Sequence, residues 1–224
     1  MEVDNFRFSD YNIADFTTQD LRVINMKLLI ASNNPGKLVE ILDLLKDLEI
    51  ELLTPAQVGL VLDVEETGKT YAENAALKGQ AFARHSGLLT LADDSGLEVK
   101  ALDGAPGLHS ARFVSRPGAT DADRRQALLQ SLAGKPRPWI ACFCCVVALV
   151  QPDGALQFAE GQCPGEIIPE ERGAGGFGYD PIFYLPEMER TMAELDMGQK
   201  NRLSHRARAV LAARPLLVKL LQDG

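Results

Sequence analysis

Two adjacent aspartates are the first residues whose type and position suggest chemistry. Asp93 and Asp94 lie in LADDSGLEV, residues 91–99, directly after the apolar run 88–92. Carboxylate oxygens are ligands that Mg²⁺ prefers, and Mg²⁺ usually takes one or two of them together with water and substrate phosphates. Neighbouring residues of a strand point to opposite faces, so we expect the two aspartates to have different roles. The run 88–92 predicts a buried strand that DDSG ends, and an Asx turn without any ligand is the alternative. The turn EETG offers two further carboxylates, Glu65 and Glu66.

A second candidate is the segment SNNPGK, residues 32–37. It follows a predicted buried strand at 27–31 and precedes apolar residues at helical spacing, which places it at a helix N-terminus. Asn34 suits the N-cap and Pro35 suits the first helical position. The free N–H groups of such a terminus, with Lys37 in the first turn, attract phosphate. The Walker A pattern GxxxxGK[ST] is not matched, and a capped turn without a ligand is the alternative.

Residues 70–87 predict a helix that carries an amide and a lysine on one face. Thr70, with Glu73 three residues later, forms a capping-box pattern at the start of this helix. Asn74 and Lys78 are four residues apart, so their side chains share a face on which they could hold an anion. An exposed polar face would explain the same pattern without a ligand.

Two stretches near the C-terminus could hold a nucleobase. GGFGYDPIF places aromatic side chains between glycines, where a ring could lie against a base, and Asp180 could accept hydrogen bonds from base N–H groups. KNRLSHR offers the donors Lys200, His205 and Arg206 at the start of a helix. Alone, the first stretch is more often a structural turn and the second a solvated helix face.

Composition narrows the class of protein. The 224 residues carry a net charge of -8, which argues against a nucleic-acid partner because that needs a basic surface. With 46% hydrophobic residues, the chain can build a sizeable core. Neither an apolar run of about 18 residues nor a signal-peptide pattern is found, so we expect a cytoplasmic protein without a membrane partner. The cysteine spacing fits neither a zinc site nor a disulfide framework, and we expect four reduced, buried thiols: Cys142, Cys144, Cys145 and Cys163.

The order of the predicted elements indicates an α/β or α+β protein. Residues 1–25 show no clear period and are interpreted as an N-terminal extension to a domain at 26–224. The remaining predicted elements are a strand region at 52–64, a helix from Thr120 to about residue 132, strands at 139–150 and 155–162, and a last helix capped by Ser204 and interrupted at Pro215.

Each signal is weak alone, but their order along the chain is specific. With GAPGLHSAR, the segments SNNPGK, EETG, ENAALKGQA, LADDSGLEV, GGFGYDPIF and KNRLSHR resemble the inosine/xanthosine triphosphate pyrophosphatase family over about residues 27–222. The resemblance implies an elongated, two-lobed α/β fold with a curved mixed central sheet flanked by helices and an active site in the cleft between the lobes. It also implies a homodimer that needs Mg²⁺ and cleaves ITP, dITP and XTP to the monophosphate and pyrophosphate.

The resemblance also assigns roles to individual residues. Glu65 and Asp94 would bind the metal, and Asp94 would accept the proton of the attacking water. Strand geometry, in contrast to the resemblance, is what leaves Asp93 to brace the turn. The triphosphate would lie on Lys78 and on the loop Ser32, Asn33, Asn34, Pro35, Gly36 and Lys37, whose first residue is Thr in many relatives. Ser95 would contact substrate, and the base would be held by Phe177, Gly178, Tyr179, Asp180, Lys200, His205 and Arg206.

Simple electrostatics agrees with these roles. A triphosphate carries about four negative charges that repel an attacking water, and Lys37, Lys78 and Mg²⁺ would offset them. Hypoxanthine and xanthine present an acceptor at position 6 toward the donors His205 and Arg206. Adenine presents a donor there, which would leave buried donors unpaired.

Two alternatives use the same residues differently. A related pyrophosphatase could act on methylated pyrimidine nucleotides, but such relatives have a Ser-Pro-Arg type loop in place of SNNPGK. A nucleotide sensor would bind ITP without turnover, but it would not need the water-activating carboxylate of Asp94.

Overall fold

The computed structural model describes residues 26–223, and the predicted extension 1–25 lies outside them. The α-helices are α1 (Pro35–Leu45), α2 (Tyr71–Ser86), α3 (Asp121–Leu132), α4 (Met197–Leu203) and α5 (His205–Asp223). The strands are β1 (Lys27–Ile30), β2 (Glu51–Leu53), β3 (Leu89–Val99), β4 (Pro106–Gly107), β5 (Trp139–Val150), β6 (Leu156–Ile167), β7 (Phe183–Leu185) and β8 (Arg190–Thr191). Short 3-10 helices span Lys100–Leu102, Ser110–Arg112, Asp180–Ile182, Pro186–Met188 and Met192–Glu194.

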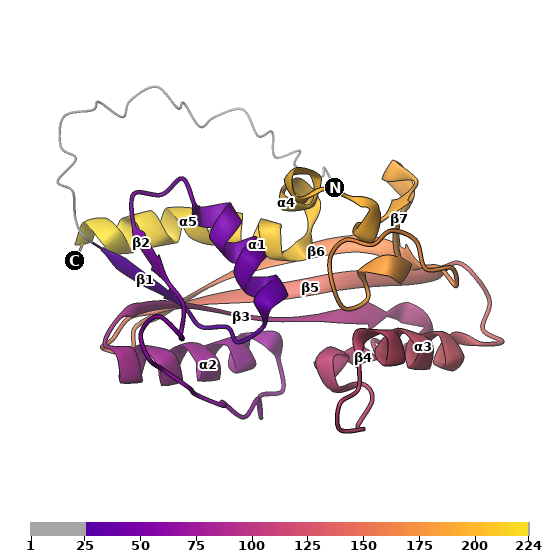
Figure 1. Cartoon of the computed structure of the whole chain (residues 1–224), viewed down its shortest axis with the longest axis horizontal. Coiled ribbons are helices and arrows are strands. Elements are labelled where there is room, and N and C mark those ends of the chain that lie inside the picture. Colours follow the sequence, from indigo (N-terminus) through magenta and orange to yellow (C-terminus); the bar gives the residue numbers. More distant parts are fainter. Residues whose placement is uncertain (1–25, 224) are drawn as a thin grey trace, which may run out of the picture.

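The strands form one mixed sheet in the order β2-β1-β3-β5-β6-β7-β8, and β4 pairs with β3 outside this path. β1 runs parallel to both β2 and β3, whereas the pairs from β3 onward are antiparallel. The long strands β3, β5 and β6 extend along most of the molecule (Figure 1). The α/β class and the mixed central sheet flanked by helices are therefore confirmed.

Helices cover both faces of the sheet (Figure 1). On one face, Val210 of α5 shares a hydrophobic core with Val147 of β5. On the opposite face, Phe82 of α2 packs with Ala92 of β3. A separate cluster, which includes Leu128 of α3, fills the other end of the long strands. Because β3 lies between two covered faces, each of its side chains is directed into one layer or the other.

Two helix starts form largely as the sequence predicts. The Asn34 side chain caps α1 by accepting from the Lys37 N–H, and Pro35 occupies the first turn. The Thr70 side chain caps α2 by accepting from the Glu73 N–H. The reciprocal half of the predicted capping box differs, because the Glu73 carboxylate accepts from the Lys69 N–H at 2.5 Å.

The predicted end of the strand at DDSG is wrong. β3 continues through this segment to Val99, and its ladder with β5 pairs Asp93 with Val147 and Asp94 with Val146. DDSG resembles a turn in composition, but the antiparallel partner supplies a backbone ladder, and tertiary contacts override the local signal. Asp93 therefore braces no turn, and both aspartates lie inside a strand.

Three other boundaries differ from the predictions. The region 52–64 yields only β2, and the rest is a loop whose Leu60, Leu62 and Val64 pack against the core on the α2 face. β6 extends to Ile167 despite Pro164, which is tolerated because β7 pairs only with the last two residues of β6. α5 continues through Pro215, and the Ser204 side chain caps it by accepting from the Ala207 N–H.

No helix within residues 26–223 is long and apolar enough to cross a membrane.

The four cysteines are free, as predicted. Cys144, Cys145 and Cys163 are buried, whereas Cys142 is partly exposed. Cys142 and Cys144 lie two residues apart on β5, with their sulfur atoms 3.9 Å apart. A hydrogen bond from Cys144 lowers the pKa of the Cys142 thiol to about 7, whereas burial raises that of Cys145 to about 12.

Cys142 is therefore expected to be the most reactive thiol in the described part of the chain. The thiolate is the reactive form of cysteine, and at pH 8 only Cys142 would be largely ionised. Brief treatment of the folded protein with iodoacetamide, followed by peptide mapping, should label Cys142 before Cys145 and Cys163. Equal labelling rates at the three positions would contradict this prediction.

Candidate active site

The segment Ser32–Lys37 joins β1 to the first turn of α1. The Ser32 hydroxyl accepts from the Asn34 N–H at 3.2 Å, and the Asn33 side chain donates to the Leu62 carbonyl at 3.0 Å. These bonds fix the loop from within and from a neighbouring segment. Its backbone N–H groups and the positive end of the α1 dipole suit an anion.

Gly36 lets another loop approach this segment closely. A Cβ at this position would lie 2.5 Å from Cδ1 of Phe177, so no larger residue fits without moving the ring. Phe177 belongs to the glycine-rich stretch predicted to hold a base. The structure therefore brings the predicted phosphate loop and the predicted base loop into contact.

Asp93 and Asp94 lie on opposite faces of β3, as predicted. Asp93 faces α1 and α5, where its carboxylate pairs with Lys37 at 3.0 Å and with Arg206 at 3.2 Å. Asp94 faces α2 and accepts from the Asn74 side chain at 3.0 Å. Asp93 thus pairs with the buried Arg206 and the partly buried Lys37, whereas Asp94 has no salt-bridge partner within residues 26–223.

The pKa values of the two carboxyls shift in opposite directions for this reason. Burial alone would raise the pKa of Asp93, but the charges of Lys37 and Arg206 outweigh it and lower that pKa. Burial raises the pKa of Asp94, and the nearby charges of Lys37 and Lys78 do not fully compensate. Asp94 is thus a carboxylate whose ionised form would gain from a further cation.

Glu66 and Lys78 lie beside Asp94. The Lys78 ammonium lies 2.9 Å from a Glu66 oxygen and donates to the Asp93 carbonyl at 2.9 Å. Arg112 pairs with the other Glu66 oxygen at 3.0 Å. Glu65, the predicted metal ligand, is exposed, whereas its neighbour Glu66 is partly buried and makes these contacts.

A buried ionic network underlies the site on the other face of β3. Its centre is Glu40, which is 4% exposed and pairs with Lys200 at 2.6 Å and with Arg206. Lys200 also pairs with Asp180 at 2.7 Å. The sequence analysis did not identify Glu40. Its position next to the apolar residues of α1 was the one local indication that this acid could be buried.

Charges in this network balance, with three carboxylates and three cations. The carboxylates belong to Glu40, Asp93 and Asp180, and the cations to Lys37, Lys200 and Arg206. Buried charges are tolerated only when paired in this way.

Several of the predicted base-binding residues make contacts with aromatic rings. Lys200 and Arg206 lie over the Phe177 ring, at 5.2 and 5.6 Å from its centroid. The buried imidazole of His205 stacks on Phe143 with centroids 4.7 Å apart. Burial and the charge of Arg206 hold the pKa of His205 well below its usual value, so the ring is neutral at pH 7.

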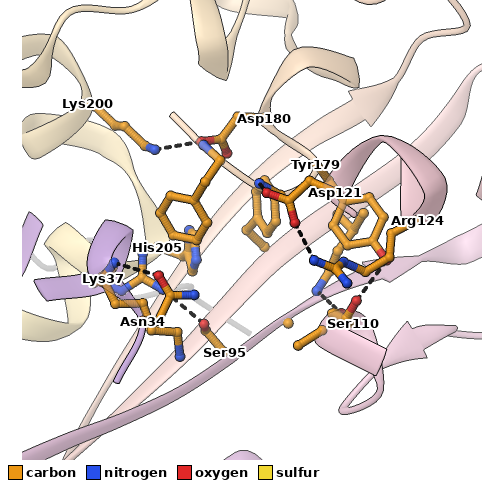
Figure 2. A pocket seen from close by; sticks show the side chains of 17 residues that line it. Asn34, Lys37, Ser95, Ser110, Asp121, Arg124, Tyr179, Asp180, Lys200 and His205 are labelled. Carbon is orange, nitrogen blue, oxygen red and sulfur yellow. Dashed lines mark hydrogen bonds and ion pairs between the residues drawn. The ribbon is translucent and has the colours of Figure 1, made fainter. Parts of the chain in front are cut away.

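A pocket of about 120 Å³ opens between these groups (Figure 2). Predicted residues that line it are Asn34, Lys37, Ser95, Phe177, Gly178, Tyr179, Asp180, Lys200, His205 and Arg206. The structure adds Gly96, Leu97, Ser110, Ala111, Asp121, Arg124 and Phe143. Asp121 and Arg124 lie across the pocket from Lys37 and Asn34 (Figure 2). Asp121 and Arg124 lie in the first turn of a capped helix, and nothing in the local sequence predicts that their side chains line the pocket.

Residues 28–216 match the sequence pattern of the Ham1 family. The chain belongs to the Ham1 family. This membership confirms the family resemblance seen in the motifs. One relative in the family is the dITP/XTP pyrophosphatase of Desulforamulus reducens, which is 47% identical over 196 residues, 87% of this chain and 97% of the relative. The dITP/XTP pyrophosphatase of Coxiella burnetii is 46% identical over 188 residues, 83% of this chain and 93% of the relative.

Solved structures of Ham1 proteins share the fold. A HAM1 protein from Coxiella burnetii superposes with a TM-score of 0.78 at 44% identity, covering 87% of this chain and 99% of that one. The Ham1 protein of Staphylococcus aureus gives a TM-score of 0.76 at 38% identity, covering 86% of this chain and 98% of that one. The Ham1 fold of this chain is thus established over most of its length.

The carboxylate oxygens at and beside Asp94 suit a hard divalent cation, which prefers oxygen ligands. Within residues 26–223 no three His, Cys, Asp or Glu side chains form a complete metal cluster. Mg²⁺ does not need one, because it takes one or two carboxylates and completes its shell with water and phosphate oxygens. Asp94, whose pKa is raised by burial, and the adjacent Glu66 supply suitable oxygens.

Removing the charge of Glu66 is therefore expected to be more harmful than removing that of Glu65. Glu66→Gln should lower turnover about tenfold or more and raise the Mg²⁺ concentration needed for half-maximal activity. Glu65→Gln should change either value less than about twofold, because the side chain is exposed. The measurement is activity as a function of Mg²⁺ concentration for both variants, at the same ITP concentration. The reverse order would assign the metal to Glu65, as the family resemblance implies.

Proposed function

We propose that this Ham1 family member hydrolyses the non-standard purine nucleotides ITP, dITP and XTP to the monophosphate and pyrophosphate, and so removes them from the nucleotide pool. One observation carries the proposal: Lys37 of the phosphate loop lines the aromatic pocket and also acts electrostatically on Asp94. A nucleotide could thus place its base in the pocket and its phosphates beside a carboxylate. The dITP/XTP pyrophosphatases among the relatives support the same activity.

The triphosphate would lie on the loop Ser32–Lys37, with the helix N-terminus and Lys37 as its main attractions. Lys78, on the neighbouring helix α2, would approach from the side of Asp94. In the structure both ammonium groups are paired with carboxylates, Lys37 with Asp93 and Lys78 with Glu66. These pairs hold the two lysines in place, so little reorganisation is needed when phosphate binds.

Asp94 would act as the general base. The Ser95 N–H and the Asn74 amide each donate to one of its oxygens, at 2.9 and 3.0 Å, which fixes the carboxylate plane. The attacking water would give its proton to Asp94 and form a bond to phosphorus, while the bond between the α and β phosphates breaks and pyrophosphate leaves. Mg²⁺ bound at Asp94 and Glu66 would polarise the phosphoryl oxygens and favour the ionised form of Asp94.

Base selection would depend on donors left over from the buried network. Arg206 has five N–H groups. Asp93, Glu40 and Ser95 use three of them, and two remain. The neutral His205 has one N–H. An acceptor at purine position 6 would satisfy such donors. The amino group of adenine would leave them unpaired, and unpaired buried donors reject such an analogue by about 10⁴.

We also propose that the enzyme works as a homodimer in the cytoplasm on free nucleotides, without nucleic acid as a partner. The dimer follows from the family resemblance alone. Light scattering at working concentration should give twice the chain mass, and a monomeric mass would refute the dimer.

Substrate preference is the test of the proposed function. The purified protein with Mg²⁺ should turn over ITP and XTP much faster than GTP and ATP. A preference for methylated pyrimidine triphosphates would assign the protein to the other class of pyrophosphatase. Tight ITP binding without turnover would identify a sensor.

A further inference from the structure

Helix α3 holds the base loop through both backbone groups of a single residue. The Asp121 carboxylate, at the start of α3, accepts from the Gly178 N–H at 2.7 Å. The Arg125 guanidinium, one turn later, donates to the Gly178 carbonyl at 2.9 Å. Gly178 thus donates one hydrogen bond to Asp121 and accepts one from Arg125, two charged side chains of the same helix.

The two side chains that hold Gly178 are themselves fixed. Arg125 forms a two-pronged ion pair with Glu171, with both N–O distances at 2.9 Å. Asp121 pairs with Arg124, which also donates to the Ala119 carbonyl at 3.0 Å. Burial alone would raise the pKa of Asp121, but the Gly178 N–H and Arg124 outweigh it and lower that pKa, so the carboxylate is ionised at neutral pH.

The conformation of Gly178 determines where its neighbours point. Its φ of +61° lies in the left-handed region, which glycine adopts without strain. On one side, Phe177 reaches the phosphate loop at Gly36. On the other side, the Tyr179 hydroxyl donates to the Ser110 carbonyl at 2.9 Å. A backbone rotation at Gly178 would move both rings, and both line the pocket.

We propose that Asp121 and Arg125 are positioning residues, which set the base-binding side chains through Gly178 and thereby control affinity for the base. Their side chains contact the base loop and, within residues 26–223, make no hydrogen bond or ion pair with Asp94, Lys37 or Lys78. Their loss should therefore weaken substrate binding with little change in the chemical step. This inference rests on the proposed function for its substrate.

Asp121→Ala is expected to raise the KM for ITP roughly tenfold or more and to change kcat less than about threefold. Asp121→Asn keeps an oxygen that can accept from Gly178 and should recover most of the affinity. The matched control is Asp123→Ala, since Asp123 caps the same helix but does not touch the base loop. It should lower the melting temperature and leave KM unchanged.

Arg125→Met provides a second variant, in case Asp121→Ala does not fold. It removes the donor to the Gly178 carbonyl and should raise KM in the same direction. An equal rise in KM for Asp123→Ala, or a fall in kcat at constant KM for Asp121→Ala and Arg125→Met, would overturn the proposal. The dissociation constant for ITP, measured by calorimetry with each protein in EDTA and without Mg²⁺, tests the same prediction in the absence of metal-dependent turnover. If the wild type binds ITP but does not hydrolyse it, the proposed function fails, and the order of these dissociation constants still decides the positioning role.

Discussion

Asp94→Asn is expected to reduce kcat for ITP by roughly 10³. Asparagine has nearly the same shape as aspartate, but it cannot take the proton of water and carries no charge for a metal. Asp94 is the carboxylate beside Lys78 and Glu66 that has no salt-bridge partner in the described part of the chain, and burial raises its pKa. Pyrophosphate release at saturating ITP and Mg²⁺ is the measurement.

The fold of this variant should persist. Each Asp94 oxygen accepts one hydrogen bond, from Ser95 N–H or Asn74, and asparagine can replace only one of these acceptors. We expect a modest fall in melting temperature, by circular dichroism, with no loss of the folded state. Activity near that of the wild type would remove Asp94 from the mechanism.

Arg206→Met is expected to cost about 3–5 kcal/mol of unfolding free energy, one of the largest stability effects available in this chain. Arg206 is 2% exposed and pairs with both Asp93 and Glu40. Methionine leaves two buried carboxylates short of a partner. For a domain of this size the change corresponds to a fall in melting temperature of roughly 10 °C.

A neighbouring arginine supplies the control for this variant. Arg208 lies two residues later on α5 and is exposed, and its guanidinium donates to the Gln162 carbonyl. Arg208→Met should cost less than about 1 kcal/mol. The double variant Arg206→Met with Glu40→Gln should lose less than the sum of the single losses, because it also removes one unpaired charge. Strict additivity would show that the pair is not coupled, and the network described here would be wrong.

The phosphate loop could be predicted because its signals are local. The N-cap at Asn34, the proline after it and the spacing of apolar residues all act within one helical turn. Strand geometry alone predicted that the side chains of Asp93 and Asp94 point to opposite faces of the sheet. This prediction is confirmed even though the predicted end of that strand was wrong. Local chemistry and periodicity are thus enough for these features.

Other parts of the site depend on contacts that no local pattern encodes. Whether Glu65 or Glu66 faces Lys78 is set by an irregular loop, which has no side-chain period. Glu40 is a site residue only because α5 brings Arg206 against it, 166 positions away. In the sequence, Asp121 is an ordinary acidic residue in the first turn of a helix. Its contact with the base loop exists only because the fold places Gly178 beside it.

The proposed reaction breaks one particular bond, between the α and β phosphates. The direct measurement is to incubate the wild-type protein with ITP and Mg²⁺ and to determine pyrophosphate and orthophosphate separately. We expect one pyrophosphate for each inosine monophosphate and no orthophosphate. Orthophosphate with inosine diphosphate would mean attack at the terminal phosphate, and the placement of Asp94 in the reaction would be contradicted.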